Sequence, residues 1–181
     1  IHEGDALQFD FSSLGANLRV VGNLPYNIST PLLFHLVTYA AHIRDIHVML
    51  QKEVVERMVA QPGGGEYGRL SVMLQYRFDM EKVLDVDPEA FYPKPKVDSA
   101  VVRMTPRAVI QPAPLDDAVF ARVVMTAFSQ RRKTLRNTLR GTMDDADFVA
   151  LAIDADARAQ TLSVSDFVGL ANRVVERAEK P

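Results

Sequence analysis

Four residues of this chain have the types and spacing needed to grip a planar base: Asn23-Leu24-Pro25-Tyr26, directly after an apolar run at 18–22. The exocyclic amine of adenine is a poor nucleophile because its lone pair is delocalised into the ring, so both amine hydrogens need acceptors. The Asn23 side-chain oxygen and the Leu24 carbonyl are two such acceptors, and Pro25 stiffens the backbone. Tyr26 offers an aromatic face. The pattern indicates methyl transfer by alignment and electrostatics, with no metal and no covalent intermediate.

The same four residues are also typical of a plain turn between a strand and a helix. Asn and Pro favour turns, and Ser29 or Thr30 followed by Pro31 would begin a helix here in any case. Because short motifs carry a high false-positive risk, the motif alone leaves both interpretations open.

Length and composition limit the class of protein. With 181 residues, 48% of them hydrophobic, the chain can bury a sizeable core as one domain, or one domain with a small appendage. We expect a cytoplasmic protein, since no apolar stretch approaches a membrane span and no signal peptide opens the sequence. There is no cysteine, hence no disulfide and no thiolate metal site. No metal is predicted from the histidines, which lack ligand-like spacing; they are His2, His35, His42 and His47.

The charges are unevenly distributed, although the net charge is only −2. Positions 129–143 contain five basic residues and no acid, and an acidic cluster follows at 144–147. On a helix, Arg132, Arg136 and Arg140 would share one face, and such a stripe could follow an RNA phosphate backbone. A solvated charged face is the competing interpretation. The predicted RNA-binding residues are Arg131, Arg132, Lys133, Arg136 and Arg140.

Short apolar runs alternate with helical patterns in the first hundred residues. The runs at 18–22 and 46–50 are typical of buried strands, and a helical pattern follows each. This alternation predicts an α/β fold with a parallel sheet covered on both faces. Two further strands, joined through a proline-rich segment at 88–95, would run antiparallel at a sheet edge. These strands are predicted at 83–86 and 100–104, and the helical patterns at 31–41, 52–60 and 70–78.

The pattern changes after Gln111-Pro112-Ala113-Pro114 and becomes helical with short breaks. Asp116, Ser163 and Ser165 are available as helix caps. We therefore predict two domains, 1–107 and 108–181, of which the second is small and all-helical. Its predicted helices are 116–128, 130–139, 146–152 and 164–178.

Three further segments complete a family pattern: Gly4-Asp5-Ala6-Leu7, the string FYPKPKVDS at 91–99 and the string FSQRRKTLRNTL at 128–139. With them the chain resembles, over nearly its whole length, the rRNA adenine N6,N6-dimethyltransferase family of the KsgA type. The resemblance implies a Rossmann-like class I methyltransferase domain followed by a small helical RNA-binding domain. It also implies S-adenosylmethionine as methyl donor and, as substrate, N6 of two adjacent adenosines near the 3′ end of small-subunit (16S) rRNA, with the reaction coupled to ribosome assembly.

The resemblance further implies roles for individual residues. Asp5 would accept a hydrogen bond from the adenine amine of the cofactor, with Ala6 lining the same pocket. Asn23 would lie between cofactor and substrate. Phe91 would cover the face of the target base opposite Tyr26, since splayed bases are commonly held between rings.

The family's glycine-rich cofactor loop and its ribose-binding acid are expected before Asp5. We therefore expect this polypeptide, taken by itself, to be an incomplete methyltransferase domain that binds S-adenosylmethionine weakly or not at all and is inactive. Gly63-Gly64-Gly65 is no substitute, because it follows a helix. The strand at 18–22 would then have an open edge, which invites self-association. Expected partners are thus rRNA, the assembling small ribosomal subunit and a second copy, with no membrane.

Three alternatives remain open. The protein could be a non-catalytic RNA-binding factor of ribosome assembly, which uses the basic helical module. It could be an Erm-type large-subunit rRNA adenine methyltransferase, although the string at 128–139 favours the KsgA type. An N6-adenine DNA methyltransferase is the third, but those enzymes commonly carry Asp in place of Asn23.

Overall fold

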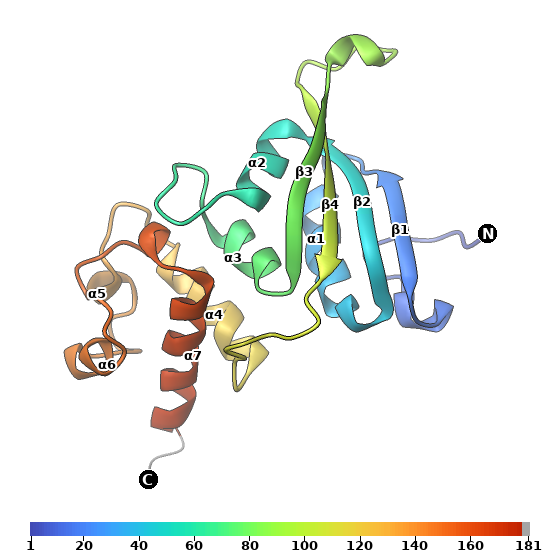
Figure 1. The fold of residues 1–181 in the computed structure, drawn as a ribbon. Helices are drawn as coiled ribbons and strands as arrows, with labels where there is room; N and C mark the ends of the chain where they lie inside the picture. The colour runs from blue at the N-terminus through green and yellow to red at the C-terminus, as the bar shows by residue number, and fades with distance from the viewer. Residues whose placement is uncertain (179–181) are drawn as a thin grey trace. The chain divides into compact units, whose positions relative to one another are not determined.

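Four strands form one mixed sheet in the computed structural model, which describes residues 1–178 (Figure 1). They are β1 (Leu18–Asn23), β2 (Ile43–Gln51), β3 (Phe78–Val86) and β4 (Ser99–Pro106), in the spatial order β1-β2-β4-β3. β1 and β2 run parallel, whereas β4 runs antiparallel to both of its neighbours. The predicted parallel pair and the predicted antiparallel pair are both confirmed.

Two helices connect the strands of this sheet. α1 (Ser29–Thr38) buries Leu32, Leu33 and Leu36, and a proline in its first turn suits a helix start. α2 (Lys52–Val59) follows β2 without a break and carries Glu53 in its first turn, where an acid complements the helix dipole. The predicted helices at 31–41 and 52–60 are confirmed to within three residues at each end. Single helical turns complete the connections at Phe11–Leu14, Ala40–His42 and Pro88–Ala90.

One face of the sheet is buried and the other is largely exposed to solvent. Alternate residues of β2 and β4 are fully buried, as the period of two requires, whereas Arg19, Val21 and Arg103 are exposed, Val21 to 71%. The expectation of a sheet covered on both faces is therefore wrong for this part of the structure, because only two helices accompany four strands. The completely buried hydrophobic side chains of the layer are Leu33, Ile46, Val48, Leu50, Val55, Met58, Phe78, Ala100, Val102 and Met104.

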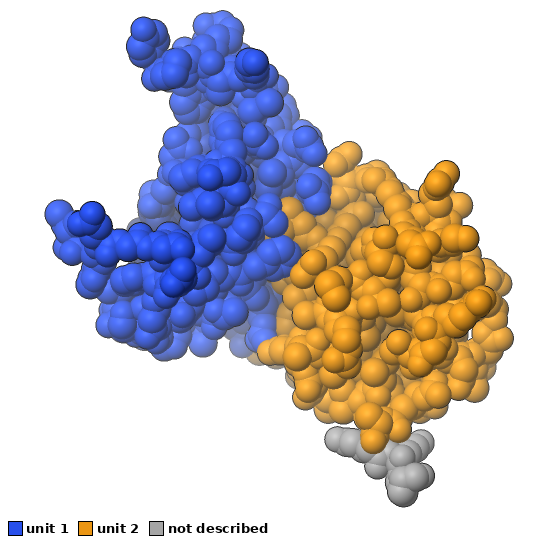
Figure 2. Space-filling view, turned by 180° about the vertical axis from the view of Figure 1, so that it is seen from behind, with its two compact units in different colours: residues 1–59, 77–108 blue, residues 60–76, 109–181 orange. Residues whose placement is uncertain are grey.

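The chain divides into two compact units (Figure 2). The first combines residues 1–59 with 77–108 and holds the sheet; the second combines residues 60–76 with the described residues from 109 onward. The segment 60–76, assigned to the first domain by sequence, packs in the second unit because Tyr76 and Phe120 are in contact in its core, with ring centroids 4.7 Å apart and the rings tilted at 46°. The functional division into 1–107 and 108–181 stays a prediction, and residues 179–181 lie outside the described residues.

Helices build the second unit. They are α3 (Arg69–Gln75), α4 (Asp117–Ala127), α5 (Leu135–Thr138), α6 (Asp145–Ala150) and α7 (Val164–Ala178). Predicted caps are confirmed at two of them: Asp116 accepts hydrogen bonds from the N–H groups of Ala118 and Val119, and Ser163 exchanges hydrogen bonds with Asp166 at the start of α7. Within residues 1–178, no helix is both long and apolar enough to cross a bilayer.

The predicted helix at 130–139 is wrong over most of its length, because only Leu135–Thr138 is helical. The backbone N–H groups of Leu135 and Arg136 donate to the carbonyls of Ala157 and Ala155, each at 2.9 Å. These bonds to a distant segment satisfy the first donors of a helix that begins late, while the residues before Thr134 form turns. The face that Arg132, Arg136 and Arg140 were expected to share does not exist.

Candidate active site

The motif at 23–26 lies at the carboxyl end of β1, on the continuation of the parallel ladder. Asn23 pairs with Met49 of β2, and the Leu24 N–H donates to the Met49 carbonyl at 3.1 Å. The chain then turns, with the Ile28 N–H donating to the Pro25 carbonyl at 3.2 Å, and α1 begins at Ser29. The motif is thus both the strand-to-helix turn of the plain interpretation and a rigid extension of the sheet.

The β3–β4 connection reaches the same edge of the sheet. Ser99, the first residue of β4, pairs with Gln51 at the end of β2 and with Val86 at the end of β3. The loop 87–98 therefore leaves and re-enters the sheet at the edge that carries the motif, and Figure 1 shows it projecting beyond the strands. Phe91 lies on this loop, directly after the turn Pro88–Ala90. Antiparallel pairing is what brings position 91 close to position 23.

A cavity of about 270 Å³ opens between the motif and this loop. Leu24 is buried, Tyr26 and Phe91 are half-buried, and Asn23 is exposed. Within residues 1–178 the Asn23 side chain makes no hydrogen bond, so its carboxamide is available to a ligand. The volume lies just below the range of about 300–1,000 Å³ that is usual for drug-sized ligands, which suits a single base. The lining residues are Asn23, Leu24, Pro25, Tyr26, Phe91, Pro93 and Pro95.

Sequence reasoning found five of these seven residues and missed Pro93 and Pro95. Both lie in the string at 91–99 that carried the family resemblance, but no pattern indicated that their rings face the cavity. Prolines restrict the backbone of the loop that holds Phe91. The alternation Pro-Lys-Pro-Lys at 93–96 indicates a restricted backbone, but it does not indicate which way the proline rings face.

Charged side chains form ion pairs at the same edge of the sheet. Lys52 Nζ lies 3.3 Å from Asp85 Oδ2, and Lys82 Nζ lies 3.1 Å from Asp85 Oδ1. Hydrogen bonds from Lys82 and Lys52 outweigh burial and lower the pKa of Asp85, and the bond to Asp85 raises the pKa of Lys52. Lys52, the first residue of α2, is therefore paired within the protein.

Asp5 and Ala6 do not line this cavity. Asp5 is exposed, and its two carboxylate oxygens accept hydrogen bonds from the Leu7 N–H at 2.9 Å and from the Gln8 side chain at 3.1 Å. Each oxygen keeps a further acceptor site, so the group fits an amine donor such as that of an adenine ring. Ala6 is half-buried. The cofactor roles of both residues stay predictions.

Aromatic contacts tie the segment that carries Asp5 to α1. His35 on α1 hydrogen-bonds the Phe9 carbonyl through Nε2 at 2.8 Å. The Phe11 ring lies 5.1 Å from Phe9 and 5.5 Å from Tyr39 between centroids, in edge-to-face geometry. His35 therefore has a structural role. Among residues 1–178 there is no group of three or more His, Cys, Asp and Glu side chains arranged to hold a metal.

The five predicted RNA-binding residues have different environments in the second unit. Arg136 donates to Asp145 and Asp156, and these hydrogen bonds raise its pKa. Arg131 donates to the Gly65 carbonyl at 2.5 Å, and Arg140 donates to Asn137 at 3.3 Å. Arg132 and Lys133 are exposed, and their side chains have no hydrogen bond or ion pair to the rest of residues 1–178, although the Lys133 backbone N–H donates to the Gln130 carbonyl at 2.9 Å.

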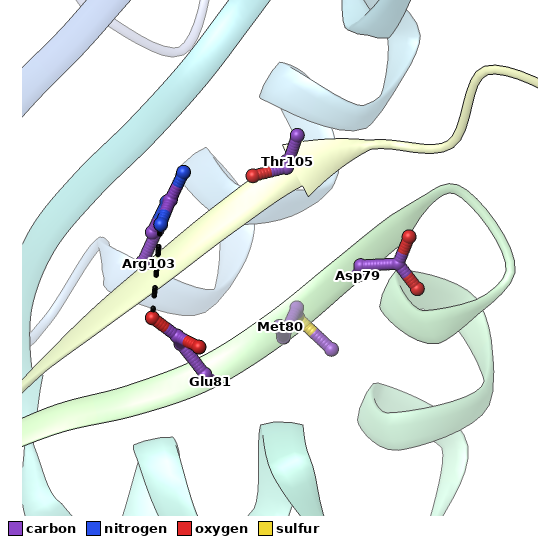
Figure 3. Close-up of a pocket in the computed structure, with 5 residues that line it drawn as sticks. All are labelled: Asp79, Met80, Glu81, Arg103 and Thr105. Carbon is purple, nitrogen blue, oxygen red and sulfur yellow. Dashed lines mark ion pairs between the residues drawn. The ribbon is translucent and has the colours of Figure 1, made fainter.

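A second cavity, also of about 270 Å³, lies at the opposite end of the β3–β4 pair (Figure 3). Figure 3 shows Glu81 of β3 beside Arg103 of β4, and their charged groups are 3.8 Å apart. Sequence reasoning missed this hollow, because alternating charged residues on an open sheet face give no signal of a concave surface. Its lining is Asp79, Met80, Glu81, Arg103 and Thr105, and the large exposure of its charged groups distinguishes it from the cavity at the motif.

Comparisons with known proteins agree with this geometry. The family model described as ribosomal RNA adenine dimethylase matches residues 1–176. Ribosomal RNA small subunit methyltransferase A of Aromatoleum aromaticum is 61% identical over 180 residues, which cover 99% of this chain and 68% of the relative. The protein of the same name from Thiobacillus denitrificans is 64% identical over 167 residues, covering 92% of this chain and 66% of the relative.

Among solved structures, a dimethyladenosine transferase from Plasmodium falciparum matches with a TM-score of 0.80 at 26% identity. The match covers 93% of this chain and 70% of that one. The arrangement of strands and helices is thus that of a Rossmann-like methyltransferase, and the chain spans about two thirds of the length of the proteins it matches.

Proposed function

This chain belongs to the ribosomal RNA adenine dimethylase family, and from that premise we propose that the protein carrying it dimethylates N6 of two adjacent adenosines near the 3′ end of small-subunit (16S) rRNA. The observation that carries the proposal is that one cavity is lined by both the motif at 23–26 and Phe91. Relatives that are 61% and 64% identical are named as small-subunit methyltransferases. That name favours the small subunit over the large-subunit, Erm-type alternative.

In the proposed reaction the cavity holds one extruded adenine. Tyr26 and Phe91 supply aromatic faces on its two sides, and such stacking contributes roughly 1–3 kcal/mol per base. The Asn23 carboxamide oxygen and the Leu24 carbonyl accept hydrogen bonds from the two amine hydrogens. These bonds favour a pyramidal nitrogen, whose lone pair then points out of the ring plane toward the methyl group. A bound sulfonium donor would supply the methyl group: its carbon–sulfur bond would break as the bond between N6 and the methyl carbon forms, the electron pair would leave with the neutral thioether sulfur, and N6 would release one proton to water.

We further propose S-adenosylmethionine as the methyl donor, which supplies an electrophilic methyl group on a sulfonium. Asp5 is the acceptor that this chain offers to the amine of its adenine ring, with Ala6 beside it and Asn23 between the two sites. The exposed Asp5 carboxylate, with acceptor sites left after its two local hydrogen bonds, supports this assignment. Binding of the donor can be measured by calorimetry, and Asp5→Ala should weaken it about tenfold, since a hydrogen bond to a charged group contributes about 1.5–3 kcal/mol.

The second unit is proposed to bind rRNA within the assembling small ribosomal subunit. Exposed Arg132 and Lys133, with no ion pair inside the described chain, support it. Arg131 and Arg140, which donate only to neutral oxygens, keep their charge available to phosphate. Arg136 is retained in the proposal only as a weaker candidate, because two carboxylates already neutralise it.

Self-association is a separate proposal, through the edge of β1. This strand ends the described sheet on one side, and Val21 is exposed on it. Light scattering on the 181-residue chain should give more than the monomer mass. Val21→Lys, which places a charge on the edge, should return the mass to that of a monomer.

Labelled methyl transfer into small subunits that lack both dimethyladenosines tests the main proposal. The protein carrying this sequence should incorporate label, and Asn23→Ala or Tyr26→Ala should abolish incorporation while leaving the circular dichroism spectrum unchanged. Binding to the same subunits without label transfer by the unmutated protein would support the non-catalytic assembly factor instead. Transfer to large-subunit rRNA only would overturn the assignment of the substrate.

A further inference from the structure

We propose that Ser99 is a positioning residue, which sets the plane of the Tyr26 ring against the target base. The inference rests on the proposed function, since it assigns to Ser99 a part in that reaction without contact with the substrate. Tyr26 Oη and Ser99 Oγ are hydrogen-bonded at 2.8 Å across 73 positions of sequence. Ser99 is completely buried and is not among the residues that line the cavity.

The position of Ser99 itself is held from both sides. It is the first residue of β4 and pairs with Gln51 of β2 and Val86 of β3. The backbone of Ser99 is fixed between two strands and its side chain is short, so its hydroxyl has little freedom to move. The Tyr26 hydroxyl therefore has a stationary partner, and the bond limits rotation of the ring about both of its side-chain torsions.

The other end of Tyr26 is fixed as well. The hydroxyl of Ser29, which is 3% exposed at the start of α1, donates to the Tyr26 carbonyl at 3.1 Å. Backbone and ring tip are thus each bound to a buried serine, while the ring itself is half-buried and lines the cavity. An aromatic wall that is fixed at two points holds the base in the reactive orientation for a larger fraction of the time.

The bond also connects the two walls of the cavity. The loop that carries Phe91 ends at Ser99, so the residue that fixes Tyr26 is also the point where this loop joins the sheet. Pro93 and Pro95 stiffen the intervening segment. Loss of the bond would loosen Tyr26 relative to Phe91, and the stack on the base would become less well aligned.

The test is a double-mutant cycle with Ser99→Ala and Tyr26→Phe, measured by steady-state methyl transfer. Each substitution removes the same hydrogen bond, and Tyr26→Phe keeps the ring. We expect each to lower kcat about tenfold, which corresponds to about 1.4 kcal/mol. The KM for rRNA should stay within about twofold, because phosphate contacts dominate RNA affinity. The double variant should be no worse than either single variant.

A buried serine elsewhere provides the control. Ser71 on α3 is also completely buried, and its hydroxyl accepts from the Gly68 N–H at 3.0 Å. Ser71→Ala should lower the melting temperature and leave kcat unchanged. A merely structural Ser99 would behave in the same way, and that result would overturn the proposal.

Three further outcomes are decisive. If Tyr26→Phe lowers kcat while Ser99→Ala does not, the phenol acts directly on the substrate and the positioning role is wrong. If Tyr26→Ala abolishes transfer while both conservative variants keep full kcat, the proposed function stands and only the role of Ser99 fails. Full activity of Tyr26→Ala would instead overturn the assignment of this cavity as the base-binding site, and the role of Ser99 with it.

Discussion

Asp147 on α6 accepts a hydrogen bond of 2.8 Å from Nε of Arg173 on α7. The carboxylate is 2% exposed, and it also accepts from Arg177 and from the Asp144 N–H in a capping box. Burial raises the pKa of Asp147, but the bonds from the Asp144 backbone, Arg173 and Arg177 outweigh it, so the net pKa is below the ordinary value. One buried carboxylate thus joins two helices of the second unit.

We predict that Asp147→Asn destabilises this unit by about 3 kcal/mol at pH 7, as expected when one partner of a buried ion pair is removed. Because the folded-state pKa is depressed, the stabilisation by Asp147 is present above the unfolded pKa of about 3.9 and is lost as pH falls through the folded value. Calorimetry from pH 7 downward should show the gap between variant and wild type closing below about pH 4. Glu176→Gln, which alters an exposed partner of Arg173 at 3.7 Å, should change stability by less than about 1 kcal/mol.

We predict that Tyr67→Phe stabilises the second unit. The Tyr67 hydroxyl is buried and has no hydrogen-bond partner among the described residues, and burial raises its pKa. Removal of an unsatisfied polar group should add about 1 kcal/mol to the free energy of unfolding. Tyr76→Phe is the matched control, because its hydroxyl donates to Asp117 at 3.5 Å, and it should have no stabilising effect. Equal changes in denaturant midpoint for both variants would contradict the prediction.

We predict that Phe91→Ala lowers kcat/KM for rRNA methylation by roughly 5- to 150-fold, from a stacking energy of about 1–3 kcal/mol per base. The neighbouring ring provides the control. Tyr92 is fully exposed and does not line the cavity, so Tyr92→Ala should keep kcat/KM within about threefold of wild type, as expected for a surface substitution of less than about 0.5 kcal/mol. The reverse order of the two effects, in steady-state kinetics, would mean that Phe91 is an ordinary loop anchor.

We predict that the basic residues at 131–140 separate into two kinds. Arg132→Ala and Lys133→Ala should each reduce the slope of log affinity against log salt by up to about 0.9 for one phosphate contact, and should leave stability unchanged. Arg136→Ala should instead lower the melting temperature, because it removes bonds to Asp145 and Asp156. Filter binding across a salt series and thermal melting measure the two properties. A loss of stability from Lys133→Ala would refute the division.

The sheet shows what the spacing of apolar residues and the length of the connections between strands can predict. β1 and β2 were expected as a parallel pair from two apolar runs separated by a helical pattern, and β3 and β4 as an antiparallel pair from their short connection. Both follow from local constraints on chain length and handedness. The late start of α5 was not predictable in this way, because its first donors bond to carbonyls about twenty positions away.

The candidate site, like the sheet, has features that the sequence predicts and features that only the tertiary structure decides. Sequence by itself determined which residues could hold a base: the motif at 23–26 and the aromatic at 91 are recognisable from type, order and the string around them. Only the tertiary structure decided that they share one cavity, because antiparallel pairing of β4 with β2 and β3 returns the loop to the end of β1. The hydrogen bond between Tyr26 and Ser99 was likewise decided by the tertiary structure. It joins residues 73 positions apart that the order of the strands brings together, and no repeating pattern in the sequence indicates it.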